Sequence, residues 1–247
     1  MDRLLALTRE AERSHFWFRG FRQFVGPLLV RAAGGRTDLR LLDCGCGTGH
    51  NLDALLSPFG RPFGFDLTPA GLAIARATGH PIVRADAAHI PFASDAFDLV
   101  TSFDMLQCVP DDRAAVREMA RVLRPGGHLV GSAAALAALH GDHSILSEEV
   151  RRYTRAGLVS LLRGAGLVPL HAAYAFAALF PLVLAVRTLQ RVRGAQATGR
   201  EIAVPAAPVN AALTWLLGRE AALARRVRMP LGSSLIFLAR KEGVRTG

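Results

Sequence analysis

The chain has 247 residues, 51% of them hydrophobic, so it is long enough to bury one large core and too apolar to be disordered. Thirty basic residues against twenty acidic ones give a formal net charge of +10, which raises nucleic acid and anionic membranes as partners. No arginine-rich run interleaved with aromatic residues is present, and this argues against nucleic-acid binding.

Three cysteines give no disulfide framework and no zinc-ligand spacing, so we expect no metal site. Cys44 and Cys46 are separated by one residue, whereas the usual redox motif has two, and we interpret them as small buried side chains. The N-terminus carries Glu10 and Glu12 soon after Asp2, which excludes a secretory signal. The expected compartment is the reducing cytoplasm.

Residues 41–49, Leu-Leu-Asp-Cys-Gly-Cys-Gly-Thr-Gly, predict the end of a buried parallel strand followed by a glycine turn. The next residues, 50–56, predict a helix with its apolar positions on one side. Such a strand, turn and helix form half of a nucleotide-binding unit, in which backbone N–H groups approach the ligand. A glycine turn that only tightens a strand–helix joint is the alternative.

The details of the turn discriminate between ligands. The dinucleotide fingerprint needs its third glycine where this chain has His50. Asp43 before the first glycine suits a cationic amino group and not a pyrophosphate. At these residues the chain resembles the class I S-adenosylmethionine-dependent methyltransferases, whose first motif is Asp-x-Gly-x-Gly-x-Gly. The resemblance implies cofactor binding by Asp43, Gly45, Cys46, Gly47 and Gly49.

Two further acids end predicted strands. Asp66 ends the strand 61–66, at the distance expected of a ribose-binding carboxylate, and Leu67 follows it. Asp86 ends the strand 82–86, where the resemblance implies contacts from Asp86 to the adenine amino group and from the Ala87 N–H to the ring. The alternative is an exposed strand-end acid for Asp66 and a helix cap for Asp86. Three acids at successive strand ends line one crevice.

The strand 97–102 is predicted to lie centrally. The resemblance places its continuation, residues 103–106, beneath the sulfonium and implies cofactor binding by Ser102 and Phe103. Relatives commonly read Glu-His-Val at 107–109, but this chain reads Gln-Cys-Val, so no base is inferred there. A helix over 111–123, a Leu-Arg-Pro-Gly-Gly turn and a strand over 129–133 follow.

The N-terminal part predicts a helix over 2–14 and a second one ending near Ala33. Between them, residues 15–19 read His-Phe-Trp-Phe-Arg. The aromatic residues either pin the first helix onto the core or, by the resemblance, let Trp17 or Phe18 wall the site. By the same resemblance Arg19 pairs with the methionine carboxylate.

The loop 134–152 contains the candidates for a general base. If the acceptor is an oxygen, His143 or His140 is the first choice and Glu149 the next. Histidines in a polar loop are more often simply solvated. A helix over 154–164 and a strand over 167–174 follow, and residues 233–241 predict the antiparallel strand that closes the sheet.

Residues 175–232 form an excursion from the sheet. Its apolar part, 175–186, is too short to cross a membrane, and Pro181 is expected to break it. Seven arginines against Glu201 and Glu220 make 191–228 net +5, and a helix containing Trp215 is expected. The alternatives are contact with an anionic membrane surface or a lipophilic substrate, and a dimer interface or plain helical packing.

Together these features predict an α/β fold: a doubly wound, seven-stranded, mostly parallel Rossmann-like sheet in the order 3-2-1-4-5-7-6. One domain spans 1–247, with a helical cap (1–35), a core (36–174 and 233–241) and a helical insertion (175–232). The expected function is methyl transfer from S-adenosylmethionine to a small, lipophilic metabolite in the cytoplasm or at the membrane periphery. A catalytically silent nucleotide-binding module and an NAD(P)-dependent oxidoreductase are the alternatives.

Overall fold

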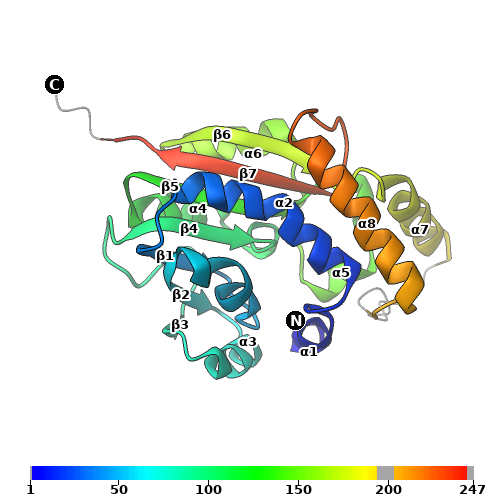
Figure 1. Cartoon of the computed structure of the whole chain (residues 1–247), viewed down its shortest axis with the longest axis horizontal. Helices are drawn as coiled ribbons and strands as arrows, with labels where there is room; N and C mark the ends of the chain where they lie inside the picture. The colour runs from blue at the N-terminus through cyan, green and yellow to red at the C-terminus, as the bar shows by residue number, and fades with distance from the viewer. Residues whose placement is uncertain (1, 194–202, 244–247) are drawn as a thin grey trace.

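A computed structural model describes residues 2–193 and 203–243. Its centre is a seven-stranded sheet in the order β3-β2-β1-β4-β5-β7-β6, as predicted, in which β7 alone runs antiparallel to its neighbours (Figure 1). The strands are β1 Leu39–Cys44, β2 Gly60–Asp66, β3 Ile82–Arg84, β4 Phe97–Phe103, β5 Leu123–Ala134, β6 Leu167–Ala175 and β7 Ser234–Lys241.

Helices cover both faces of this sheet. The α-helices are α1 Asp2–Ala11, α2 Phe16–Ala33, α3 Pro69–Ala75, α4 Asp112–Val122, α5 Asp142–Leu146, α6 Arg155–Gly164, α7 Phe180–Arg193 and α8 Ala207–Ala224. Short 3₁₀ or π turns are η1 Leu52–Leu56, η2 Ser57–Phe59, η3 Arg76–Thr78, η4 Leu106–Cys108 and η5 Ala137–Leu139. None of the described helices is both long and apolar enough to cross a bilayer.

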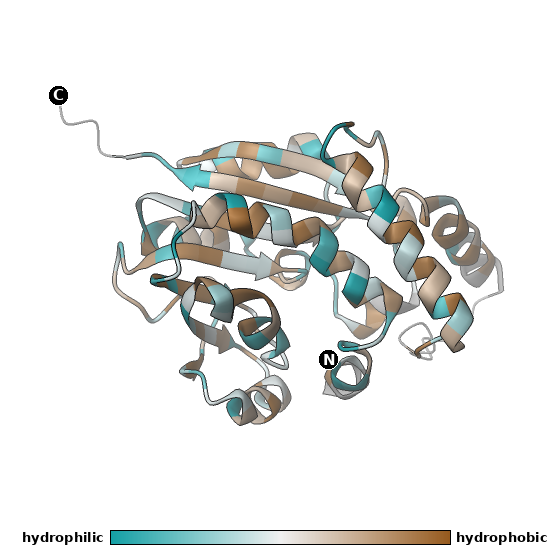
Figure 2. Cartoon of the chain, viewed as in Figure 1, coloured by the Kyte–Doolittle hydropathy of each residue, from teal (hydrophilic) through white to brown (hydrophobic). Residues whose placement is uncertain are grey.

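Two hydrophobic clusters hold the helices to the sheet, because successive strand residues point to opposite faces. Leu42 and Phe237 point toward α4 and α6, and lie in one cluster with Met119. Leu41 and Leu238 point toward α2, η1 and α8 and lie in the other. Figure 2 shows β7 as hydrophobic over most of its length, with hydrophilic residues at its C-terminal end. The predicted doubly wound architecture is therefore confirmed.

The N-terminal cap and the insertion pack on each other, although they are far apart in sequence. A Cβ on Gly20 of α2 would lie 2.5 Å from Leu217 of α8, so glycine permits this close approach. Asn210 joins the two segments further, since its Oδ1 accepts from Phe16 N and its Nδ2 donates to Ser14 O, both at 2.8 Å. One side of α8 is thereby buried against α2. This side of the helix agrees with the interpretation that the insertion packs on the rest of the chain.

Several expected boundaries differ from the structure. Pro181 does not break the apolar segment; it lies in the first turn of α7, where a missing N–H costs no hydrogen bond. The strand β5 begins at Leu123 instead of 129, because Leu123 already pairs with Phe97 of β4, ahead of a shift in the register of the two strands. Residues 12–14, expected to be helical, form a turn after α1. Arg200 and Glu201, counted in the charge of the insertion, lie outside the described residues.

The packing of α8 on α2 gives a stability prediction. Leu217→Ala removes a fully buried side chain, so the free energy of unfolding should fall by about 2–5 kcal/mol in a chemical denaturation experiment. Leu223→Ala is the matched control, because Leu223 lies on the same helix with 51% of its surface exposed. Equal losses from the two variants would contradict the packing described here.

Candidate functional site

The glycine turn is bound to the neighbouring strand through its backbone. Gly45, Gly47 and Gly49 have φ angles of 73°, 52° and 78°, a region that favours glycine. The N–H groups of Gly45 and Cys46 both donate to Phe65 O of β2 at 2.9 Å. A Cβ on Gly45 would lie 2.6 Å from Met105, so the turn also fits closely against the end of β4.

Asp66 joins three backbone segments at the carboxyl end of β2. Its Oδ2 accepts from Gly47 N at 2.9 Å, and its Oδ1 accepts from the N–H and the hydroxyl of Thr68 at 2.8 and 2.5 Å. Thr68 is the N-cap residue of α3, but its hydroxyl donates to Asp66 and makes no capping hydrogen bond to the helix. The predicted ribose-binding carboxylate is thus held in a fixed position next to the glycine turn.

Asp43 is buried in the middle of the sheet edge, with 2% of its surface exposed. Its Oδ1 accepts from the Thr101 hydroxyl of β4 at 2.7 Å. Burial raises the pKa of the Asp43 carboxyl to about 7; the Thr101 hydrogen bond opposes this shift and the Asp66 charge adds to it. A cation placed beside Asp43 would favour its ionised form, which fits the predicted contact with a ligand's amino group.

Asp86 is the least enclosed of the three acids. It lies two residues after β3, is exposed, and its Oδ1 accepts from Ala88 N at 2.9 Å. In this structure Asp86 therefore makes the contact of a capping acid, the alternative to adenine binding. Ala87 is buried beside it, and Leu67 at the next strand end has 56% of its surface exposed. This apolar side chain and the two acids are what a nucleoside would meet at the ends of β2 and β3.

The thiols of the glycine turn are not reactive groups. Burial raises the pKa values of Cys44 and Cys46 well above that of a free thiol, so neither forms a thiolate near neutral pH. The Cys46 side chain fills the space in front of Gly64, where a Cβ would lie 2.9 Å from its sulfur. Within the described residues there is no group of side chains able to hold a metal ion.

The end of β4 lies beside the turn, since Cys44 pairs with Ser102 in the sheet. The Ser102 hydroxyl is fully buried and has no hydrogen-bond partner among the described residues. Phe103 packs edge-on against Phe21 of α2, with ring centroids 5.2 Å apart. Buried hydroxyls normally have partners, so Ser102 fits a site completed by a ligand.

The N-terminal segment contacts the turn through residues that the sequence patterns did not single out. The Thr48 hydroxyl donates to Glu12, at 2.6 and 2.8 Å from the two carboxylate oxygens. Arg22 donates to Glu12 O at 2.9 Å and lies 3.5 Å from His50 Nε2. Burial raises the pKa of Glu12, against the effects of the Thr48 hydrogen bond and the Arg22 charge. The cap therefore closes one side of the glycine turn.

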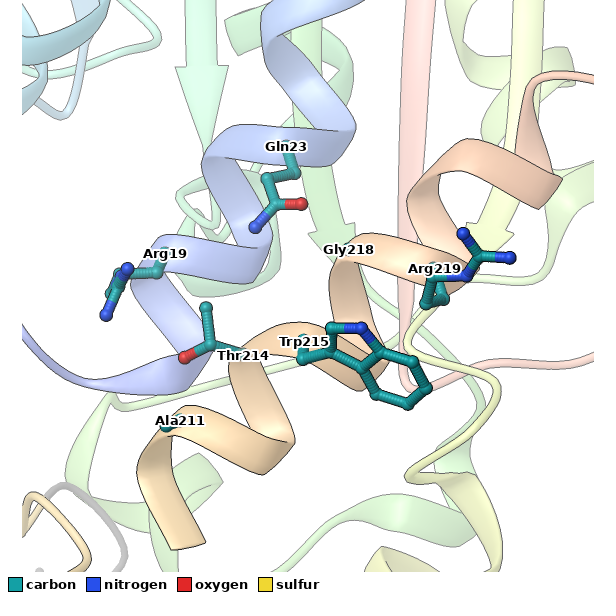
Figure 3. A pocket seen from close by; sticks show the side chains of 7 residues that line it. All are labelled: Arg19, Gln23, Ala211, Thr214, Trp215, Gly218 and Arg219. Carbon is teal, nitrogen blue, oxygen red and sulfur yellow. The ribbon is translucent and has the colours of Figure 1, made fainter. Parts of the chain in front are cut away.

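Trp17 and Arg19 of α2 both lie against the insertion. Trp17 stacks on Phe176 at 3.9 Å between ring centroids, which joins α2 to the insertion and matches the interpretation that the aromatic run pins the helix. Arg19 is exposed and lines a pocket between α2 and α8 (Figure 3). On α2 it is Arg22 whose guanidinium reaches the turn. The contact of Arg19 with a cofactor carboxylate stays a prediction that this arrangement does not support.

The candidate bases lie in the loop after β5. Glu149 is almost completely buried and paired with Arg152, whose Nε and Nη2 donate to its two oxygens at 2.9 and 3.2 Å. This pairing makes Glu149 an anchor for Arg152, which also donates to Ala135 O and Ser144 Oγ. His140 is exposed at the end of η5. The side chain of His143 lies outside the described part of the structure.

Gln107 and Cys108, at the positions where relatives commonly read Glu-His, have structural roles here. Gln107 is buried; its Oε1 accepts from Ala134 N at 3.2 Å and its carbonyl accepts from Val150 N at 2.8 Å. Burial raises the pKa of the Cys108 thiol to about 12. Neither side chain can accept a proton readily near neutral pH, in agreement with the absence of a base inferred from the sequence.

Residues 42–131 match the methyltransferase domain family. The chain is 37% identical to a phthiotriol/phenolphthiotriol dimycocerosates methyltransferase of Mycobacterium leprae over 97 residues, 36% of each chain. It is 42% identical to a demethylmenaquinone methyltransferase of Mycolicibacterium paratuberculosis over 91 residues, 37% of this chain and 40% of the other. The matched part is thus less than half of the length of these relatives.

Among solved structures, phosphoethanolamine N-methyltransferase 2 of Haemonchus contortus, in complex with S-adenosyl-L-methionine, superposes with a TM-score of 0.65. The superposition covers 98% of this chain and 57% of that one at 18% sequence identity. At this identity the likeness shows a common fold and nothing more.

The raised pKa of Asp43 predicts how stability depends on pH. The folded state binds the proton more tightly than the unfolded chain, whose carboxyl titrates near about pH 4. Its contribution to stability is complete below that pH and is lost as the pH rises through about 7. The free energy of unfolding of the wild type should therefore fall, relative to Asp43→Asn, between about pH 4 and pH 7. Parallel pH profiles of the two proteins in chemical denaturation would contradict a buried, uncompensated carboxyl.

Proposed function

We propose that the protein is an enzyme that transfers a methyl group from S-adenosylmethionine to a small, lipophilic acceptor, because residues 42–131 match the methyltransferase domain family. The observation that carries this proposal is the joint placement of the glycine turn, Asp43 and Asp66 at adjacent strand ends. Asp43 offers a buried carboxyl to the amino group of the cofactor, and Asp66 offers a fixed carboxylate to its ribose hydroxyls.

The remaining contacts follow from the same edge of the sheet. Asp86 and the Ala87 N–H lie at the next strand, where an adenine ring would rest beside the exposed Leu67. The end of β4, with the buried Ser102 hydroxyl, faces the position of the reactive end of the cofactor. When bound, the cofactor supplies an activated methyl group on a positively charged sulfur.

The chain's own contribution is positioning and exclusion of water. In an in-line displacement the acceptor's electron pair forms the new bond to the methyl carbon while the carbon–sulfur bond electrons return to sulfur. The protein must therefore align acceptor, methyl group and sulfur in a dry site. Glu12, Thr48 and α1 cover one side of the glycine turn, and the packed aromatic rings of Phe21 and Phe103 close off the end of β4.

A proton on the acceptor must leave during or after transfer. Glu149 is committed to Arg152, so we assign this role first to His140 or His143 in the same loop. For an acceptor that reacts without a bound proton, no base is needed. The two histidines therefore matter only if the methyl group goes to a hydroxyl oxygen.

Two features bear on the chemical class of the acceptor, namely the insertion and the substrates of the relatives. The helices α7 and α8 lie toward the carboxyl ends of the parallel strands (Figure 1), and they carry exposed Leu182, Leu189 and Trp215. The two relatives named above are methyltransferases of a dimycocerosate and of a quinone. Both features favour a lipophilic small molecule over a nucleic acid, and contact of 175–228 with a membrane belongs to the same proposal. A homodimer through the insertion stays a prediction.

Cofactor binding is the first test. S-adenosylhomocysteine, titrated by calorimetry, should bind the wild type, and Asp66→Asn should bind it about tenfold to a hundredfold more weakly, because hydrogen bonds to a charged group are lost. Asp38→Asn is the matched control: it changes an exposed aspartate at the other end of β1 and should leave the affinity unchanged.

Two outcomes would overturn the assignment. Binding of NADH without binding of S-adenosylhomocysteine would favour the oxidoreductase alternative. Binding of S-adenosylhomocysteine without transfer of label from methyl-labelled S-adenosylmethionine to any lipophilic acceptor would favour the silent binding module.

The second test concerns the base. If the acceptor is a hydroxyl, the double variant His140→Ala/His143→Ala should lower kcat by about 10²–10⁴-fold while the affinity for S-adenosylhomocysteine is unchanged. Single variants show which histidine is responsible. Undiminished turnover in the double variant, measured as labelled product by mass spectrometry, would remove both residues from the mechanism.

A further inference from the structure

One face of the molecule combines exposed apolar side chains with arginines. On α8, Trp215 has 68% of its surface exposed and Leu223 51%, and Val227 shortly after the helix is half exposed. Trp215, Arg219 and Leu223 follow one another at intervals of four residues, so they form one stripe along the helix, and Arg226 lies in the turn that follows. Figure 2 shows hydrophobic and hydrophilic residues alternating along α8 where it lies beside α2. We call the surface of these two helices the α2–α8 face.

The charge of this face has one sign. From α2 the face contains Arg19 and no acidic residue, while Arg22 of the same helix is directed to Glu12 and the glycine turn. Residues 207–231 carry four arginines and one acid, Glu220. Glu220 is buried and accepts from Ala177 N at 2.7 Å and from Ala178 N at 2.9 Å, so it holds the chain before α7 and does not neutralise the surface. On the opposite side of the sheet, by contrast, Arg121 of α4 is paired with Glu118 at 2.6 Å.

The two helices enclose a shallow pocket of about 360 Å³. Figure 3 shows Gln23 and Thr214 between the helices, with Trp215 on α8 and the guanidinium groups of Arg19 and Arg219 on opposite sides. Its rim is cationic, because the guanidinium groups of Arg19 and Arg219 flank it, and these groups suit a phosphate oxygen; the Thr214 hydroxyl already donates to Asn210 O at 2.7 Å. The exposed indole beside it offers an apolar ring with a polar N–H.

Trp, Leu and Arg on one exposed helix face are the side chains that place a helix in the interface of an anionic bilayer. We propose that the α2–α8 face binds the surface of an anionic lipid bilayer, with Trp215 at the headgroup level and a lipid phosphate in the pocket between Arg19 and Arg219. This inference adds a membrane-binding surface to the proposed function. It rests on that function in one respect, the lipophilic character of the acceptor. When this face is bound to the bilayer, the carboxyl ends of the parallel strands lie near the membrane. A lipophilic acceptor would be dissolved in that membrane.

Other occupants fit the face less well. A nucleic acid would be held by the arginines alone and would leave the exposed Trp215 and Leu223 without an apolar partner. A second copy of the chain, docked by the same face, would bring together two surfaces whose exposed charges are all arginines, and like charges in contact oppose association. An anionic bilayer matches both the charge and the apolar side chains.

The test is a vesicle flotation experiment with the full chain and no cofactor or acceptor, so that its result is independent of methyl transfer. Vesicles contain equal parts of phosphatidylglycerol and phosphatidylcholine, or phosphatidylcholine only. The wild type should float with the anionic vesicles, less at 0.5 M salt than at about 0.1 M because surface charges are then screened. Arg219→Gln/Arg226→Gln should lower the partition coefficient by about tenfold or more, since each arginine near an anionic surface contributes severalfold.

Arg113→Gln/Arg117→Gln is the matched control, because it removes two exposed arginines of α4 on the other side of the sheet and changes the net charge equally. It should retain the wild-type partition coefficient. Trp215→Ala should also weaken flotation, and Trp215 should be shielded from a soluble fluorescence quencher only by the anionic vesicles. Circular dichroism and thermal unfolding show that each variant is folded.

The proposal would be overturned by equal flotation with both vesicle types, by no flotation, or by equal losses from the two double variants. It would also be overturned if duplex DNA bound with the same dependence on Arg219 and Arg226 and displaced the protein from the vesicles. Loss of flotation in Arg219→Gln/Arg226→Gln with unchanged binding of S-adenosylhomocysteine would separate this surface from the cofactor site.

Discussion

The carboxylate of Asp66 fixes the geometry on which the rest of the site depends. By accepting from Gly47 N and from the backbone and hydroxyl of Thr68, it joins the glycine turn, the end of β2 and the start of α3. The turn can approach the strand this closely because its glycines adopt positive φ angles. Asp43 adds a buried carboxyl whose ionisation is costly until a cation lies beside it. The edge of the sheet is therefore prepared for a ligand that has both a cationic end and a polyol.

The cap and the insertion complete this edge as one layer. Gly20 lets α8 pack closely on α2, Asn210 joins the start of α8 to the turn before α2, and Trp17 stacks on Phe176. The insertion thus leaves one half of α8 buried and the other half exposed as the arginine-bearing face. A single helix in this way contributes both to the stability of the domain and to the surface that we propose for the membrane.

The sequence predicted the parts of the molecule that depend on local patterns. The family identification from residues 41–49 is confirmed by the match over 42–131, and the strand order is confirmed by the sheet. Contacts between distant segments were not predictable: Glu12 with Thr48 and α8 with α2 leave no periodic signal. Pro181 was misinterpreted, because a proline in an apolar run signals a helix start as well as a break. Glu149 resembled a free base until its partner Arg152 was placed beside it.

A crystal structure of the protein with S-adenosylhomocysteine tests the central claim most directly. The account predicts the ribose hydroxyls within hydrogen-bond distance of the Asp66 carboxylate, the amino group of the ligand beside Asp43, and the adenine between Leu67 and Ala87. A nucleoside bound elsewhere in the molecule, or one at the glycine turn with Asp43 and Asp66 directed away from it, would contradict the account.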